Sequence, residues 1–498
     1  MAETETQDQA YVDNGVKVVQ TDVDNKDGQV KCPKCGSTDI STNAATGQLR
    51  CNFCRFEFEP QKLEMETDIS KLSGTTIGSG AQDIVADTKD QITLKCTSCG
   101  AEVVIDTASA NQARCHWCRN TLSLNQQIPN GAIPDMVLAF KVKKDEAKKA
   151  IESFVGKRKF YAHPKFRQEF TTNNIMGVYF PYMVVDLNAH SHLTGLGEHQ
   201  TRSYSEGSGE HRVTYYDADL YQVGRDFDLT IHGLSIESNK DRLDTTNKTK
   251  TNNIINSIMP FDVENSVKYD SNYLKGFTSE RRDSNITELT PIITERAKDI
   301  ARFSANASLK NYDRGVSWQS EQLDIKGQQW KAAYLPVWLY SYQEDKGDRK
   351  LLHYVAVNAR TKESMGSVPI YLPKLFLFAF LVELLGIFGF IKLDFDYDFL
   401  LLLVGPLYFF YIYTKYRNQN ARDQYETETK TNVTNLKTMD QFIEHRKRLR
   451  NSKIENQNNT TVRGASMNLK KKTGLGLDLD LKNFAADQLS SITDQFLK

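Results

Sequence analysis

The stretch CPKCGSTDISTNAATGQLRCNFC occupies residues 32–54, and CTSCGAEVVIDTASANQARCHWC occupies residues 96–118. Both follow the spacing C-x2-C-x15-C-x2-C, and the second set of cysteines repeats the first at an offset of 64 residues. A C-x-x-C pair forms a tight turn that points both sulfurs at one ion, and two such turns complete a tetrahedral thiolate site. The sequence therefore predicts two zinc ribbons near the N-terminus.

The eight cysteines of the chain all belong to these two sets, so none is left over for a disulfide elsewhere. Four thiolates leave no open coordination position, which indicates two structural Zn²⁺ ions rather than catalytic ones. The acidic N-terminal MAETETQDQA has neither the basic start nor the apolar run of a signal peptide, so the cysteines are expected in a reducing cytosol. Paired cysteines there more often hold metal than form bridges. The predicted ligands are Cys32, Cys35, Cys51 and Cys54 in ribbon 1, and Cys96, Cys99, Cys115 and Cys118 in ribbon 2.

Each ribbon is nearly neutral, and each carries one aromatic residue between the cysteines of its second turn, Phe53 and Trp117. If exposed, these rings could stack on nucleic-acid bases. They could instead cover a very small hydrophobic core, and we favour this second interpretation. Weak basic charge also argues against tight nucleic-acid binding. His116 is expected at the surface and not as a ligand.

The middle of the chain combines helical and strand patterns. Apolar spacing predicts helices near 144–157 and 290–309. The segments 177–186 and 333–340 resemble each other and read as two strands entered through a proline, which suits an edge or a first position. A β-hairpin is expected across the polar turn at 343–350.

Four histidines lie within 22 positions, and the first two would share one face of a strand. Two interpretations stay open, a second metal site or a solvated hairpin, and the hairpin is favoured. No phosphate-binding loop or nucleophile motif accompanies them, so no enzymatic activity is expected and a small-molecule substrate is disfavoured. The histidines are His190, His192, His199 and His211.

Two apolar runs, 375–391 and 399–413, predict a transmembrane helical hairpin within residues 373–413. Basic residues flank the pair and aspartates fill the loop between the runs, so both termini are expected in the cytosol of a multi-pass cell-membrane protein. Glu383 within the first run is either functional or a neutral carboxyl at the helix contact. The following region, 414–498, holds sixteen Lys/Arg against ten acids and is expected to be a basic, helical tail, either contacting anionic lipid or simply solvated.

The tandem CPKCG…CNFC and CTSCG…CHWC ribbons, DEAKKAIESFVGKRKF, GVYFPYMVVD, YLPVWLYSY and the final hydrophobic hairpin resemble the transcription-factor-IIB-type zinc-ribbon membrane proteins of Gram-positive bacteria. The ribbons are also similar to those of primosomal protein N-prime, but the chain has no helicase ATP-binding loop. The resemblance implies a recruiting or anchoring role, linked in some relatives to the membrane stress response.

The predicted fold class is a multidomain α+β protein with zinc ribbons, a β-rich middle region with helices, a transmembrane hairpin and a helical tail. The predicted function is a membrane-anchored cytosolic adaptor or scaffold that binds a protein partner and membrane lipid. The alternative is a membrane tether that binds DNA or RNA through the ribbons and the basic tail. The expected divisions are a disordered acidic N-terminus (1–29), ribbon 1 (30–59), a linker (60–93), ribbon 2 (94–125), the α+β cytosolic region (130–368), the hairpin (373–413) and the tail (414–498).

Overall fold

A computed structural model of the chain shows a β-rich protein with few helices, so the α+β multidomain expectation is wrong. Fifteen strands form one mixed sheet, to which segments from residue 10 to residue 450 contribute. The structure describes, with short gaps, residues 10–21, 32–82, 91–128, 134–239, 258–392, 403–416 and 430–450.

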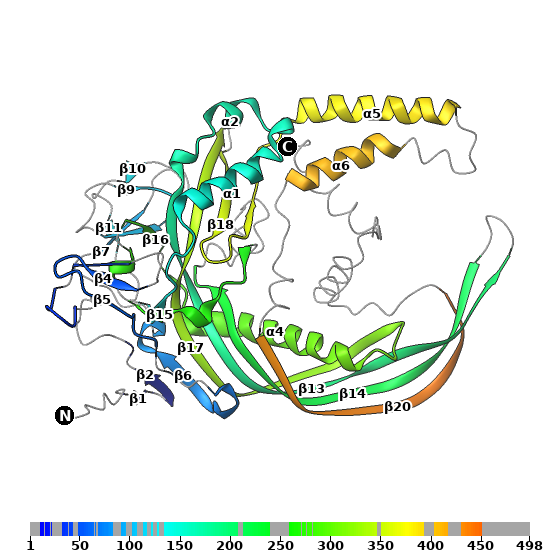
Figure 1. Cartoon of the computed structure of the whole chain (residues 1–498). Helices are drawn as coiled ribbons and strands as arrows, with labels where there is room; N and C mark the ends of the chain where they lie inside the picture. The colour runs from blue at the N-terminus through cyan, green and yellow to red at the C-terminus, as the bar shows by residue number, and fades with distance from the viewer. Residues whose placement is uncertain are drawn as a thin grey trace.

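Four long strands form the centre of the sheet: β13 (Met176–Glu206), β14 (Val213–Glu237), β17 (Gly315–Asp345) and β20 (Lys430–Arg450). β13 lies between β17 and β14, and β20 pairs with β14. Figure 1 shows these strands bending together into a curved arm, with helix α4 (Ile286–Ala305) along its inner side. The shorter strands are β1 (Ala10–Asp13), β2 (Val16–Val19), β6 (Gly74–Gly78), β7 (Gln91–Lys95), β8 (Glu102–Asp106), β11 (Gln127–Ile128), β12 (Met136–Val137), β15 (Val267–Lys268), β16 (Thr278–Glu280), β18 (Lys350–Asn358) and β19 (Ser364–Gly366).

The two similar segments, 177–186 and 333–340, pair with each other as antiparallel parts of β13 and β17, with Pro181 opposite Tyr334 and Tyr179 opposite Pro336. Neither proline enters its strand. On the side away from β17, β13 pairs with β16 before Pro181 and with β14 after it. On the side away from β13, β17 pairs with β12 before Pro336 and with β18 after it. A missing N–H is tolerated at both points because no ladder donor is needed there.

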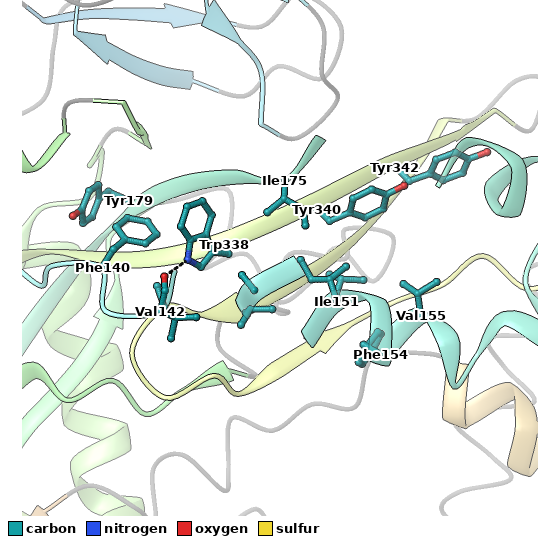
Figure 2. Close-up of a cluster of buried hydrophobic side chains, with 14 of the residues drawn as sticks. Phe140, Val142, Ile151, Phe154, Val155, Ile175, Tyr179, Trp338, Tyr340 and Tyr342 are labelled. Carbon is teal, nitrogen blue, oxygen red and sulfur yellow. Dashed lines mark hydrogen bonds between the residues drawn. The ribbon is translucent and has the colours of Figure 1, made fainter. Parts of the chain in front are cut away.

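The predicted helix near 144–157 and the hairpin after Pro336 are confirmed. Helix α1 (Lys144–Gly156) buries Ala147, Ile151, Phe154 and Val155 against the sheet. The hairpin is formed by β17 and β18. Figure 2 shows the α1 side chains in one cluster with aromatic residues of β17, where Trp338 Nε1 donates a 2.8 Å hydrogen bond to the Val142 carbonyl. The short helix α2 (Pro164–Glu169) adds Phe166 to this cluster.

Helix α4 begins earlier than predicted, at Ile286, because Asn285 and Glu288 form a capping box. Pro291 therefore falls in the second turn, beyond the first-turn positions where a helical N–H lacks an internal partner. Ile293, Ala297 and Ile300 belong to a buried cluster with residues of β13, β14 and β17.

Two segments expected to lack structure belong to the sheet. Residues 1–29 contain β1 and β2, and Val18 of β2 is buried. Residues 60–93 contain β6, which pairs in parallel with both β2 and β17. Leu72 and Ile77 of this stretch are buried, so it is an integral part of the fold and not a linker.

A buried carboxyl group, that of Asp135, joins these N-terminal strands to β17. Its oxygens accept hydrogen bonds from the Gly80 and Ala332 backbone N–H groups, each at 2.7 Å, and from the Thr21 hydroxyl. Burial raises the pKa of Asp135 to about 6, although these donors act in the opposite direction. A Cβ at Gly78 would lie 2.3 Å from the carboxylate, so the site requires glycine there.

The two apolar runs form helices α5 (Leu372–Lys392) and α6 (Val404–Tyr416). Over the residues that the structure describes, no helix is both long and apolar enough to cross a membrane. The prediction of a transmembrane hairpin, and of the multi-pass cell-membrane localisation that depended on it, is therefore not supported. α6 has only 13 residues, fewer than the ~20 that a spanning helix needs.

Helices α5 and α6 pack against each other and attach at one end to the body. Tyr408 Oη lies 2.5 Å from Tyr161 Oη, and Lys374 Nζ donates to the Phe160 carbonyl at 2.9 Å. Glu383 accepts a 2.7 Å hydrogen bond from the Gly405 N–H in the first turn of α6, where a carboxylate interacts favourably with the helix dipole.

The outer surface of this helix pair is apolar. Eleven large side chains are exposed to between 36% and 72%. We define the α5–α6 apolar face by these residues: Phe376, Leu377, Phe380, Leu381, Leu384, Leu385, Ile387, Phe388, Leu403, Leu407 and Tyr411.

Replacement of Gly405 with alanine is expected to separate the two helices. The added Cβ would lie 2.6 Å from Glu383 Cβ and 2.7 Å from the Ala379 carbonyl oxygen. Overpacking of this kind costs about 1–3 kcal/mol. Amide hydrogen exchange in α6 should accelerate, whereas the control Gly156→Ala, whose new Cβ meets nothing within 4 Å, should leave it unchanged. Equal exchange in both variants would contradict the close packing at Gly405.

The prediction of a helical tail is also wrong over residues 430–450, which form the strand β20. Pairing along β14 over most of its length supplies the backbone hydrogen-bond partners, and three register shifts follow the bend of the arm. Arg225 of β14, which is buried, holds Asp440 of β20 at 2.6 Å.

Candidate metal centre

Ribbon 1 is a three-stranded sheet of β3 (Ile40–Thr42), β4 (Leu49–Cys51) and β5 (Glu57–Phe58). Its two C-x-x-C turns have matching backbone geometry. The Gly36 N–H donates to the Cys32 carbonyl at 2.8 Å, and the Arg55 N–H donates to the Cys51 carbonyl at 2.9 Å. Gly36 and Arg55 both have positive φ, 72° and 61°, which reverses the chain immediately after each cysteine pair.

These turns bring four sulfurs together. Cys32 Sγ lies 3.5 Å from Cys54 Sγ, and Cys35 Sγ lies 3.5 Å from Cys51 Sγ. All four ligand atoms lie within 4.8 Å of one another. Tetrahedral zinc with Zn–S bonds of ~2.3 Å places its sulfurs roughly 3.8 Å apart, so this group fits such an ion. The group Cys32, Cys35, Cys51 and Cys54 could therefore hold a metal ion such as zinc, as the spacing predicted.

The electrostatic environment favours thiolate at the buried ligand Cys51. The Cys54 backbone N–H points at Cys51 Sγ from 3.5 Å. This N–H is the largest cause lowering the pKa of Cys51 to about 6, and the Phe53 N–H adds to it against the effect of burial. Because the thiolate is the metal-binding form, this backbone arrangement favours metal binding at Cys51, whereas burial and the neighbouring cysteines raise the pKa of Cys35 to about 12.

One side of ribbon 1 is docked on the body of the protein. Ile40 of β3 and Leu49 of β4 are fully buried and belong to the same hydrophobic cluster as α1 and Trp338. Ile40 pairs directly with Cys51 across the β3–β4 ladder. The metal centre and the main core are therefore linked by adjacent residues of one small sheet.

The other side of ribbon 1 is open to solvent. The Phe53 side chain, which we favoured as a core residue, is 80% exposed, so that expectation is wrong. Phe56 is 39% exposed, stacks on Phe58 and has Lys34 Nζ 5.9 Å from its ring centroid. We call Lys34, Phe53, Arg55 and Phe56 the ribbon-1 knuckle surface. Lys34, Arg55 and Phe56 were missed as site residues, because the cysteine spacing does not indicate which side of the ribbon faces solvent.

Ribbon 2 is described in part. Cys115 is buried, whereas Cys96, Cys99, Cys118 and Trp117 lie outside the described residues, so a second metal site is not shown. The strands β9 (Ala113–Arg114) and β10 (Thr121–Leu122) form a separate two-stranded sheet. The strands β7 and β8 join the main sheet through β16, so ribbon 2 is built into the body.

His116 is buried, and the expectation of a surface position is wrong. Its Nε2 lies 2.7 Å from Glu280 Oε1, and its ring packs edge-on against Phe180. Because Glu280 is on β16 beside β8, the contact joins the second C-x-x-C turn of ribbon 2 to the main sheet. Glu280 is 164 positions away from His116 in the chain, so the sequence around His116 does not indicate this contact.

The described members of the histidine cluster do not come together. His190 and His192 share a face as predicted, and both contact Asp226. His199 lies elsewhere, 2.7 Å from the Asn311 carbonyl, and His211 is outside the described residues. Among the described residues, the only metal-binding group of at least three ligands is that of ribbon 1. His190 instead bridges Asp226 and Asp228 in a polar network between β13 and β14.

Comparison with family models, with curated proteins and with solved structures finds no match to this chain. The resemblance to the zinc-ribbon membrane proteins of Gram-positive bacteria therefore stays a prediction.

Proposed function

We propose that this chain is a non-catalytic adaptor that binds a protein partner through the ribbon-1 knuckle surface. The observation that carries the proposal is Phe53, a large apolar side chain that is 80% exposed at a metal-binding turn. Exposed aromatic side chains on a rigid support are typical centres of protein interfaces. The proposal includes one structural Zn²⁺ in ribbon 1 and a second in ribbon 2.

Zinc would supply rigidity rather than chemistry in this role. Four cysteine ligands fill a tetrahedral coordination sphere, so no position remains for a substrate or an activated water. The docked side of the ribbon, through Ile40 and Leu49, fixes the orientation of the knuckle relative to the body. A partner would therefore meet a preorganised surface, which lowers the entropic cost of association.

The exposed Phe53 also favours the alternative, nucleic-acid binding, because its ring is free to stack on a base. Lys34 and Arg55 could contact phosphates, but the acids Asp39, Glu57 and Glu59 lie on the same ribbon. Arg50 is paired with Glu57 at 3.8 Å. A surface with balanced charge suits a protein better than a polyanion, for which affinity depends on phosphate neutralisation.

The test is affinity capture of the full chain from nuclease-treated extract, comparing wild type with Phe53→Ser. Truncation of an interface hot spot costs about 2 kcal/mol or more, so recovery of the partner should fall at least tenfold. The matched control is Val12→Ser, which alters another side chain that is 72% exposed. Unchanged recovery with Phe53→Ser would contradict the proposal. Nucleic-acid binding would be favoured instead if nuclease treatment removes the bound material and if, without nuclease, its recovery falls steeply as the salt concentration rises.

A further inference from the structure

The α5–α6 apolar face holds eleven of the nineteen large apolar side chains that are exposed among the described residues. Its eight members on α5 span about half the circumference of the helix at 100° per residue. On the opposite side of α5, Leu375 and Ala379 are buried. Monomeric proteins rarely expose contiguous apolar patches larger than a few hundred Å², so this face needs a covering partner.

The charged groups of the described part of the helix pair do not serve a charged ligand. Lys374 donates to the Phe160 carbonyl, Glu383 accepts from the Gly405 N–H, and Lys415 Nζ lies 5.9 Å from the Tyr411 ring. An acidic or basic partner would lose hydration on this face without gaining an ion pair. The partner must therefore be apolar over a matching area.

The area agrees with that of a stable dimer. At roughly 150 Å² or more per large side chain, eleven half-exposed side chains offer on the order of 900 Å² per copy. Specific interfaces bury ~800 Å² per partner, and those of obligate homodimers resemble a hydrophobic core cut in half. A second copy carries the same apolar helix pair, and two such pairs can close a four-helix bundle around a two-fold axis.

We infer that the α5–α6 apolar face is the interface of a homodimer, in which the helix pairs of two chains form a four-helix bundle. The inference is independent of the proposed role of ribbon 1. In this arrangement the dimer carries two copies of the ribbon-1 knuckle surface, which would add avidity to binding of a multivalent partner.

Sedimentation velocity of the purified full chain tests the inference. Wild type is expected to sediment as a dimer of twice 56.7 kDa, and the double variant Phe380→Lys with Leu385→Lys as a monomer. The control Met439→Lys, which alters a side chain of similar exposure on β20, should remain dimeric. Unchanged circular dichroism and zinc content would show that the double variant is folded. A monomeric wild type, or a double variant that stays dimeric, overturns the inference.

Photo-crosslinking identifies the occupant directly. Benzoylphenylalanine in place of Phe380, which is 60% exposed, should yield a covalent dimer joined through α5 or α6 of the second chain. An adduct within one chain, or with the lipid of added phosphatidylglycerol vesicles in place of a dimer, would show a different occupant and overturn the inference.

Discussion

Replacement of Cys51 with serine is expected to release the metal of ribbon 1 and to lower the stability of the whole body. Binding of a structural zinc contributes roughly 10–16 kcal/mol to the folding of small zinc modules. Ile40, opposite Cys51, and Leu49 would leave the cluster that contains α1 and Trp338. Loss of two buried aliphatic side chains costs about 1.5–3 kcal/mol each, so we expect a decrease of about 3–6 kcal/mol in the free energy of unfolding.

Urea unfolding followed by tryptophan fluorescence measures this decrease, since Trp330 and Trp338 are buried in the body. Elemental analysis should show one zinc fewer per chain than in the wild type. The matched control is Lys34→Ser, which alters an exposed side chain beside Cys35 and leaves the ligands intact. A Cys51→Ser protein with wild-type stability would show that ribbon 1 folds and docks without metal.

Replacement of Asp135 with alanine is expected to have the second large effect, a loss of about 3–5 kcal/mol. The variant would leave the Gly80 and Ala332 N–H groups without an acceptor in the interior, whereas the Thr21 hydroxyl could still donate to Ser79 Oγ at 2.7 Å. Each buried donor without a partner costs about 1–3 kcal/mol. Thermal and urea unfolding measure the change, and a value below 1 kcal/mol would show that water or a shifted backbone replaces the carboxylate.

The same residue gives a pH dependence whose direction can be tested. The pKa of Asp135 is raised from 3.8 to about 6, so the folded state binds this proton more tightly than the unfolded state. Stability contributed by Asp135 is therefore fully present below pH ~4 and is lost as the pH rises through ~6, by about 3 kcal/mol. The stability of the wild type relative to Asp135→Asn should fall by this amount over this interval, because asparagine does not ionise. A wild type that instead gains stability relative to Asp135→Asn as the pH rises would show that the donors outweigh burial.

Local sequence patterns correctly predicted the elements whose structure depends mainly on residues close to them in the chain. The cysteine spacing identified the four sulfurs of ribbon 1, because each C-x-x-C turn is closed by its own backbone. The apolar spacing identified α1, and the alternating aromatic segments identified β13, β17 and β18. The described parts of the two apolar runs form helices, but composition alone overstated their ability to span a membrane.

The errors occurred where distant segments decide the outcome. Residues 430–450 contain few helix-breaking residues and read as a helix, yet they extend because β14 offers a long edge with which to pair. His116 is buried because Glu280 lies beside it on a neighbouring strand. Phe53 is exposed because ribbon 1 docks through Ile40 and Leu49, a choice of side that depends on the shape of the body.

The most direct test of the central claim is a photo-crosslink from position 53 in the full chain, with and without removal of metal by a chelator. Benzoylphenylalanine in place of Phe53 should form an adduct with a protein partner in nuclease-treated extract, and that adduct should disappear when ribbon 1 loses its metal. An adduct with nucleic acid before nuclease treatment, or a protein adduct that persists without metal, would contradict a metal-supported protein-binding knuckle.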